Sequence, residues 1–379
     1  MIILLFDLDG VLLQPHGYQK ALSDTVTQIA EALGFAGVHL SFDLIDRFES
    51  VGLTSEWDSS AACAALLLDR AWTHDPTLQL PTSLPFNLPP QHNLPPPDFK
   101  AFAQALGEAG TNTPAMDRAR HLIVGNSKHS EAKKESLRAL MLGARDPQKA
   151  ITYNLFQERI LGSETYSETY NLMAHLDTES YLLSFDRPTL SLEERGRLEN
   201  WLEAPDHFAA IFTNRPTPWP DGSQGTPEGQ LGVQLCNLSA IPIVGYGEMT
   251  WLSALHGERP EAFLKPSPIH TLAALQSALG KPPATAARSA VDLLHSDQGE
   301  EEWRVLDGCM VYVFEDSAKG FQSALGTRDT LASIGVTLEL RFLGVGAGSA
   351  KGPALEATGA RLYPSLGHAL QEIDDLELR

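Results

Sequence analysis

The sequence predicts an α/β fold, in which a Rossmann-like parallel sheet carries a large inserted α-helical domain. The first observation behind this prediction is a set of short apolar runs, at residues 2–6, 208–212, 241–244, 310–314 and 340–345. Such runs are typical of parallel strands that helices cover on both faces. The second observation is that helical patterns lie between most of these runs. The third is a long helical interval after the first run, which interrupts the alternation.

Capping signals predict where the helices between the strands begin. Ser191 and Glu194 have the spacing of a capping box, for a helix that continues to about residue 203. Ser267 followed by proline predicts another helix start, and Gly280 ends that helix. Ser317 is the expected N-cap of a helix after the fourth apolar run.

Residues 15–186 are predicted to form a helical domain inserted into a core of residues 1–14 and 187–379. Leu22, Val26, Ile29 and Leu33 recur at helical spacing and define one buried face. Further helices are expected over residues 41–51, 58–72, 99–108 and 130–142. Residues 76–97 are rich in proline, so we expect an extended surface loop there rather than a helix.

Composition disfavours several classes of function. The formal net charge of -20 argues against nucleic acids and anionic membrane surfaces as partners. Cys63, Cys236 and Cys309 stand far apart, which is typical of a reducing cytoplasm and not of a disulfide scaffold or a zinc site. No apolar stretch reaches the roughly 18 residues that span a bilayer. The sequence does not indicate an oligomeric state.

Acidic residues follow the first and the fourth predicted strands. Asp7, Asp9 and Gly10 come after the first strand, and Glu315 and Asp316 end the fourth. We expect these side chains to converge, because the carboxyl ends of parallel strands meet at one edge of a sheet. Clustered carboxylates repel one another unless a cation lies among them, and a set of oxygen ligands favours Mg²⁺.

Two further segments bring groups that suit a phosphoryl group. Thr213, Asn214 and Arg215 follow the second strand, and Lys265 stands just before the helix that Ser267 begins. A lysine, a hydroxyl and backbone N–H groups opposite a metal can hold a phosphoryl group. In this order the four segments resemble the motifs of the haloacid dehalogenase-like superfamily, over a core of about 200 residues. The helical insert resembles the type-1 cap of its subfamily I, although it is unusually long.

The resemblance implies a role for each catalytic position. Asp7 corresponds to the nucleophile that forms an aspartyl-phosphate intermediate. Asp9 corresponds to the general acid and base. Thr213 would hydrogen-bond the transferring phosphoryl group, and Lys265 would neutralise charge on the nucleophile and on the phosphoryl oxygens.

The resemblance also implies a magnesium site. Asp316, the Asp7 carboxylate and the main-chain carbonyl of Asp9 would hold Mg²⁺, and Glu315 would act through a metal-bound water. The dehalogenases of the superfamily lack the aspartate that corresponds to Asp9, and they need no metal. The sequence therefore predicts a Mg²⁺-dependent phosphatase, a phosphoric monoester hydrolase of a small phosphorylated metabolite.

Gly10, Asn214, Arg215 and Trp57 are the predicted substrate contacts. Trp57 belongs to the insert, where caps of this superfamily choose the substrate. An alternative for Trp57 is packing at the start of a helix that Asp58 caps.

Two other functions are compatible with parts of the sequence. A phosphomutase of the same superfamily is one alternative, but sugar phosphomutases carry an Asp-Thr pair and a histidine just after the first motif. The corresponding positions here are Gln14, Pro15 and Gln19, so this pattern is missing. A non-catalytic binding protein is the other alternative, and the proline-rich loop and acidic surface would suit it.

Overall fold

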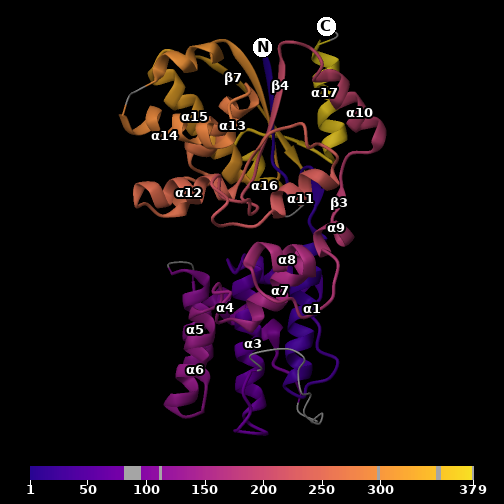
Figure 1. Ribbon diagram of the computed structural model, residues 1–379, viewed down its shortest axis with the longest axis vertical. Helices are drawn as coiled ribbons and strands as arrows, with labels where there is room; N and C mark the ends of the chain where they lie inside the picture. Colours follow the sequence, from indigo (N-terminus) through magenta and orange to yellow (C-terminus); the bar gives the residue numbers. More distant parts are fainter. Residues whose placement is uncertain (81–94, 111–112, 297–298, 347–350, 378–379) are drawn as a thin grey trace. The chain divides into compact units, whose positions relative to one another are not determined.

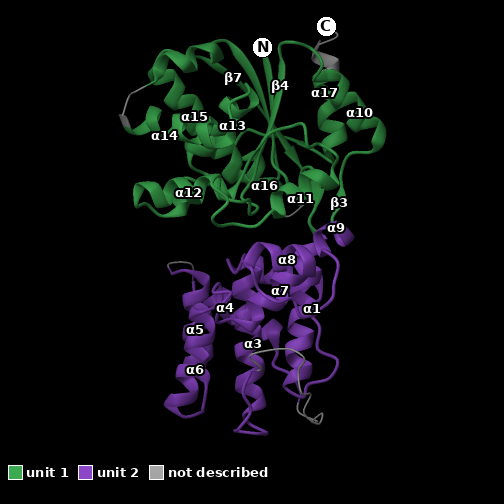
Figure 2. Cartoon of the chain, in the orientation of Figure 1, with its two compact units in different colours: residues 1–15, 186–379 green, residues 16–185 purple. Residues whose placement is uncertain are grey.

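The computed structural model describes residues 1–80, 95–110, 113–296, 299–346 and 351–377 (Figure 1). The chain divides into two compact units (Figure 2). Unit 1 consists of Met1–Pro15 and Asp186–Arg379, and unit 2 is the segment His16–Phe185 between them. The proline-rich loop predicted over residues 76–97 falls largely outside the described residues.

Unit 1 is built on a six-stranded sheet in which every pair of neighbouring strands is parallel. The strand order is β5-β4-β1-β6-β7-β8. The strands are β1 (Ile2–Phe6), β4 (His207–Phe212), β5 (Ile243–Val244), β6 (Cys309–Glu315), β7 (Leu338–Val345) and β8 (Arg361–Tyr363). The predicted α/β fold with a Rossmann-like sheet is therefore confirmed, and five of these strands coincide with the five apolar runs.

Alternate residues of β1 pack against opposite layers of helices, because successive side chains of a strand point to opposite faces. Ile3 and Leu5 belong to one apolar cluster, which includes residues of α13 (Pro268–Ala278), α14 (Pro283–Ser296) and α15 (Ala318–Ser333). Leu4 and Phe6 belong to the other, with residues of α10 (Leu192–Trp201) and α17 (Leu366–Glu377). Figure 1 shows α13, α14 and α15 on one side of the sheet and α10 and α17 on the other.

Shorter elements complete unit 1. The remaining helices are α11 (Glu228–Leu235), α12 (Tyr246–His256) and α16 (Gly352–Glu356), and two 3₁₀ segments span Pro260–Ala262 and Glu300–Leu306. The strands β2 (Leu13–Gln14) and β3 (Arg187–Pro188) pair antiparallel, with Gln14 opposite Arg187. This small ladder joins the two chain segments that leave unit 1 and return to it.

The described part of unit 2 is helical. Its helices are α1 (His16–Ala32), α2 (Phe42–Ser50), α3 (Glu56–Ala71), α4 (Phe99–Glu108), α5 (Ala115–Asn126), α6 (Glu131–Leu142), α7 (Ile151–Leu161), α8 (Ser163–Tyr170) and α9 (Tyr181–Phe185). The apolar stripe predicted for α1 is buried, and α1 packs on α3, α7 and α9. No helix in the described ranges is both long and apolar enough to cross a membrane.

Two of the predicted caps are present as expected. The Ser191 hydroxyl accepts from the Glu194 N–H at 3.2 Å and the Glu194 carboxylate accepts from the Ser191 N–H at 2.8 Å, which is the predicted capping box. Ser267 caps α13, where its hydroxyl accepts from Ile269. The predicted cap of α3 was wrong, because that helix begins earlier, with Ser55 as its N-cap and Asp58 inside its first turn.

We expect Leu5→Ala to destabilise unit 1 by about 2–5 kcal/mol, because Leu5 belongs to β1 inside the six-stranded sheet and is completely buried. Urea unfolding would measure the loss. Leu255→Ala is the matched control, since Leu255 is 57% exposed on α12 and should change the free energy of unfolding by less than about 0.5 kcal/mol. A similar loss in both variants would contradict the packing described here.

Candidate functional site

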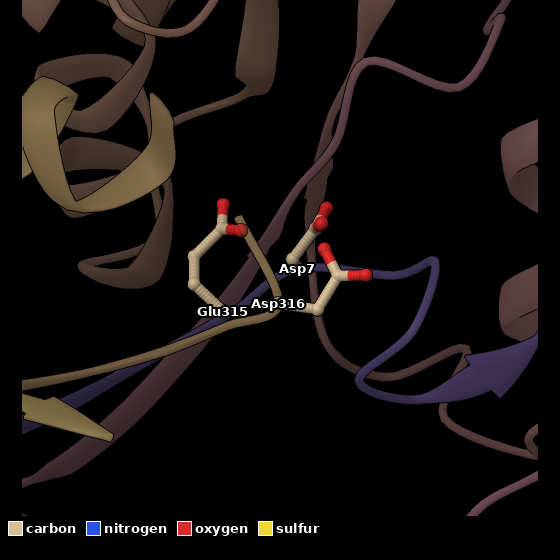
Figure 3. A group of neighbouring side chains, drawn as sticks. All are labelled: Asp7, Glu315 and Asp316. Carbon is tan, nitrogen blue, oxygen red and sulfur yellow. The ribbon is translucent and has the colours of Figure 1, made fainter. Parts of the chain in front are cut away.

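Three carboxylates gather at the carboxyl edge of the sheet, where the adjacent strands β1 and β6 end. Asp7 follows β1, Glu315 is the last residue of β6, and Asp316 follows it. The register pairs Phe6 with Phe314, and the Asp7 N–H donates to the Phe314 carbonyl at 2.9 Å. One oxygen of each carboxylate lies within 4.8 Å of the others, and Figure 3 shows the group.

Lys265 lies within this group and is buried. Its Nζ is 2.9 Å from Asp7 Oδ1 and 2.6 Å from Glu315 Oε1. The same nitrogen donates to the Phe212 carbonyl at 2.9 Å and lies 4.1 Å from the centre of the Phe212 ring. One ammonium group therefore contacts residues at the ends of β1, β4 and β6.

Burial and crowding determine the protonation of this cluster. Burial raises the pKa of Asp7 well above its ordinary value, and the negative charge of Glu315 adds to the rise although Lys265 opposes it. The pKa of Glu315 is also raised, first by burial. Burial disfavours the charged form of Lys265, but Asp7 and Glu315 outweigh it and raise the pKa of Lys265. Lys265 therefore stays charged, but its single positive charge does not balance the charges of three carboxylates.

Both oxygens of Glu315 have protein partners. Oε1 accepts from Lys265, and Oε2 accepts from the N–H and the hydroxyl of Ser317 at 3.2 and 3.0 Å. Ser317 is the N-cap residue of α15, as predicted, but its side chain bonds to Glu315 and makes no cap hydrogen bond to the helix. Glu315 lies directly over Gly320, where an added Cβ would come within 1.8 Å of Oε1.

Gly10 is required for the fit of Asp316. Its φ is +77°, in the region that side chains rarely adopt, and its N–H donates to the Leu13 carbonyl at 2.7 Å in the turn after Asp9. A Cβ at this position would lie 2.2 Å from Asp316 Oδ2. Gly10 was predicted as a substrate contact, and the structure gives it this steric role beside a carboxylate.

Thr213 follows β4 at the same edge and is buried. Its N–H donates to the Val244 carbonyl at 3.0 Å, and its hydroxyl accepts from the Arg215 N–H at 3.0 Å. The ring of His270, which the sequence did not indicate, also contacts the Val244 carbonyl, at 3.0 Å. Burial, together with the nearby charge of Lys265, lowers the pKa of His270 to about 3. Asn214, by contrast, is exposed.

Arg215 was predicted to contact substrate, but its side chain is completely buried. It holds the carboxylate of Asp9 with two nitrogens, Nε at 3.2 Å from Oδ2 and Nη2 at Oδ1. The same Nη2 lies 3.0 Å from Oδ2 of Asp186, a buried residue that sequence patterns did not single out. In this structure the guanidinium holds Asp9 and Asp186, and a substrate contact by Arg215 stays a prediction.

Trp57, the fourth predicted substrate contact, is half-buried in unit 2. Its indole N–H donates to Gln157 Oε1 at 2.9 Å, and its ring stacks on Tyr153. Asp58 beside it accepts two hydrogen bonds from Arg145, at 3.1 and 2.8 Å. These contacts show Trp57 in the packing of unit 2, and a substrate contact stays a prediction.

Lys351 is a further cation at the edge that the sequence did not indicate. Its Nζ lies 2.5 Å from Asp316 Oδ2, and its side chain is 59% exposed. No motif or periodicity precedes this lysine in the sequence. Only the spatial proximity of the segments after β6 and β7 brings it to Asp316.

Carboxyl groups outnumber cationic side chains at this edge. Five carboxylates and three cationic side chains of the described residues meet there: Asp7, Asp9, Asp186, Glu315 and Asp316 against Arg215, Lys265 and Lys351. The formal excess is two negative charges. The cluster of Asp7, Glu315 and Asp316 could therefore bind a metal ion.

No protein-family model matches the chain, and no curated protein sequence matches it. Two solved structures resemble it. The X-ray structure of Northeast Structural Genomics Consortium target ZR25 is 18% identical, covers 99% of both chains and has a TM-score of 0.66. Phosphatase Tt82 from Thermococcus thioreducens is 14% identical over 95% of this chain and 100% of its own, with a TM-score of 0.46. The first shows a shared fold, and the second is too distant to support a conclusion.

We expect Lys351→Met to tighten the binding of Mg²⁺ by about three- to tenfold, because the lysine ammonium repels a cation beside Asp316 and salt screens part of that repulsion. Isothermal titration calorimetry with Mg²⁺ would measure the dissociation constant. Lys281→Met is the matched control, because Lys281 also lies 2.5 Å from a carboxylate, that of Glu302, outside the cluster. Unchanged or weaker binding by Lys351→Met would count against a metal site at Asp316.

Proposed function

We propose that this protein is a Mg²⁺-dependent phosphatase of the haloacid dehalogenase-like type, which hydrolyses a small phosphorylated metabolite through an aspartyl-phosphate intermediate. The observation that carries the proposal is the buried Lys265, bonded to both Asp7 and Glu315 beside Asp316. A nucleophilic carboxylate, a fixed cation and an acidic metal site are the groups that phosphoryl transfer from a monoester needs.

In this proposal, a carboxylate oxygen of Asp7 forms the new bond to phosphorus while the bond to the leaving oxygen breaks. Asp9 donates its proton to that oxygen, so the alcohol leaves neutral. Asp9, now a carboxylate, then takes a proton from the water that attacks the phosphorus of the aspartyl phosphate. The bond between phosphorus and Asp7 breaks, which releases inorganic phosphate and restores both residues.

The other residues at the edge would stabilise charge. Lys265 neutralises negative charge on Asp7 and on the phosphoryl oxygens, and Thr213 with the Asn214 N–H would hydrogen-bond the phosphoryl group. Asp7, Asp316 and the main-chain carbonyl of Asp9 would hold Mg²⁺, while Glu315, whose oxygens already have partners, would act through a bound water. When bound, Mg²⁺ would neutralise charge on the carboxylates and on the phosphoryl oxygens.

Unit 2 would act as the cap that selects the substrate in this proposal. The support is its place in the chain, since it is inserted between β2 and β3, directly after the segment with Asp7 and Asp9. The proposed substrate is a small phosphorylated metabolite, and a cytoplasmic location is part of the same proposal.

Asp7→Asn should abolish phosphate release from a panel of phosphorylated metabolites assayed with Mg²⁺. The amide keeps the shape of the side chain but cannot form the aspartyl phosphate. Asp329→Asn, at an exposed position of α15, is the control and should keep full activity. Circular dichroism would verify that both variants are folded. Full activity of Asp7→Asn would exclude Asp7 as the nucleophile, and an isomerised sugar phosphate without released phosphate would indicate a mutase instead.

Asp316→Ala should raise the Mg²⁺ concentration needed for half-maximal activity by more than about tenfold, because it removes a direct oxygen ligand. A Mg²⁺ titration of phosphate release at fixed substrate would measure the shift. Ca²⁺ should inhibit the unmodified protein, since its larger and less regular coordination shell does not fix the reacting oxygens. Activity that survives EDTA would rule out the metal-dependent mechanism.

A further inference from the structure

A buried chain of charges extends from Asp9 into the interior of unit 1. Arg215 bridges two carboxylates, those of Asp9 and Asp186, and the Arg215 and Asp186 side chains are completely buried. The Asp9 side chain remains 34% exposed. The two interior members of the chain therefore hold a carboxylate that still reaches solvent. A buried ion pair that only stabilises the fold needs no such accessible third member.

Asp186 is fixed to the turn that carries Asp9. It is the first residue of unit 1 after unit 2, and the next two residues form β3, which pairs with β2. Beyond β3, Thr189 bonds twice to the same turn: its N–H donates to the Leu12 carbonyl at 3.0 Å, and its hydroxyl donates to the Val11 carbonyl at 2.5 Å. Hydrogen bonds therefore connect the segment that follows Asp186 to the turn that follows Asp9.

Asp186 holds the guanidinium group of Arg215 in place. Arg215 contacts Asp9 through both Nε and Nη2, a bidentate arrangement that fixes the plane of the Asp9 carboxylate. A flexible arginine side chain provides this orientation only if its own end is held in place. Asp186 holds it, since Nη2 is shared between the two acids. Without Asp186, the guanidinium would lose one of the contacts that fix the orientation in which it holds Asp9.

We propose that Asp186 is a positioning residue, which acts through Arg215 to orient the carboxyl group of Asp9 for proton transfer to the leaving oxygen. This inference rests on the proposed phosphatase function and assigns a second residue to its proton-transfer step. It also gives Arg215 a role other than substrate binding. Asp186 touches no reacting atom, so we expect it to act only on the two proton transfers of Asp9, of which kcat/KM reports the first.

The test exploits the leaving group. An alkyl phosphate releases a poor leaving group and needs the proton of Asp9, whereas 4-nitrophenyl phosphate releases a stable phenolate and hardly needs it. General acid catalysis contributes about 10²–10⁴-fold to such reactions. We therefore expect Asp186→Asn to lower kcat/KM for the alkyl phosphate by more than about tenfold, and for 4-nitrophenyl phosphate by less than about threefold. Asp186→Glu, which keeps the charge, should restore part of the loss.

A double-mutant comparison separates positioning from folding. If Asp186 acts only through Asp9, adding Asp186→Asn to Asp9→Asn should lower the residual activity no further. Asp206→Asn is the matched control, because Asp206 is 65% exposed in unit 1 and its loss should leave both substrates unaffected. Equal losses of Asp186→Asn on both substrates, or additive losses in the double variant, would overturn the inference while leaving the phosphatase function intact.

Inactivity of the unmodified protein would test the proposed function itself and not only the role of Asp186. If the unmodified chain releases no phosphate from either ester with Mg²⁺, the proposed function fails, and the role of Asp186 fails with it. If Asp186→Asn does not fold, Arg215→Lys provides the same test, since it keeps the positive charge but cannot contact Asp9 and Asp186 in the same way. A larger loss of kcat/KM for the alkyl phosphate than for 4-nitrophenyl phosphate in that variant would support the positioning of Asp9 through Arg215. Equal losses for the two substrates would refute it.

Discussion

The ammonium group of Lys265 is the contact on which the functional edge of unit 1 depends. The strands β4, β1 and β6 are neighbours in the sheet, and Lys265 bonds to a residue at the end of each. It also compensates part of a buried negative charge that would otherwise be very costly. Removing one partner of a buried ion pair commonly lowers the free energy of unfolding by about 3–5 kcal/mol. Lys265 therefore stabilises the fold, whatever it contributes to catalysis. The contacts that connect the ends of these three strands also hold a positive charge beside Asp7.

Much of this arrangement could be predicted because its signals are local. Five buried strands are continuous apolar runs, and in a parallel sheet the polar residues that follow such runs meet at one edge. Asp7, Glu315 and Asp316 were identified in this way, Lys265 was identified from its place just before the helix that Ser267 begins, and the structure brings the four together. The strand β8 was missed because its three residues are too short to form an apolar run.

Departures from these predictions arise where other contacts replace the expected ones. Ser317 is the N-cap residue of α15, but its hydroxyl donates to the buried carboxylate of Glu315 and accepts no hydrogen bond from the helix, so here a local contact replaces the cap bond. Arg215 follows the segment expected to bind phosphate, yet two acids from distant parts of the chain enclose it. Asp186 and Lys351 carry no sequence signal, because each acquires its partner only when segments far apart in the chain meet. The sequence names the residue types at an edge, whereas the fold decides which of them face each other.

The ladder between β2 and β3 has a consequence for the modularity of the protein. Gln14 and Arg187 are paired residues, so the two ends of unit 2 are attached to unit 1 at neighbouring points. Two antiparallel strands can be joined by a hairpin loop of about two to five residues. The whole of unit 2 is therefore exchangeable in principle for a short turn, since no strand of the six-stranded sheet belongs to it. Replacing the inserted helices by such a turn would leave the order of the six strands, and with it the framework of the carboxylate edge, unchanged.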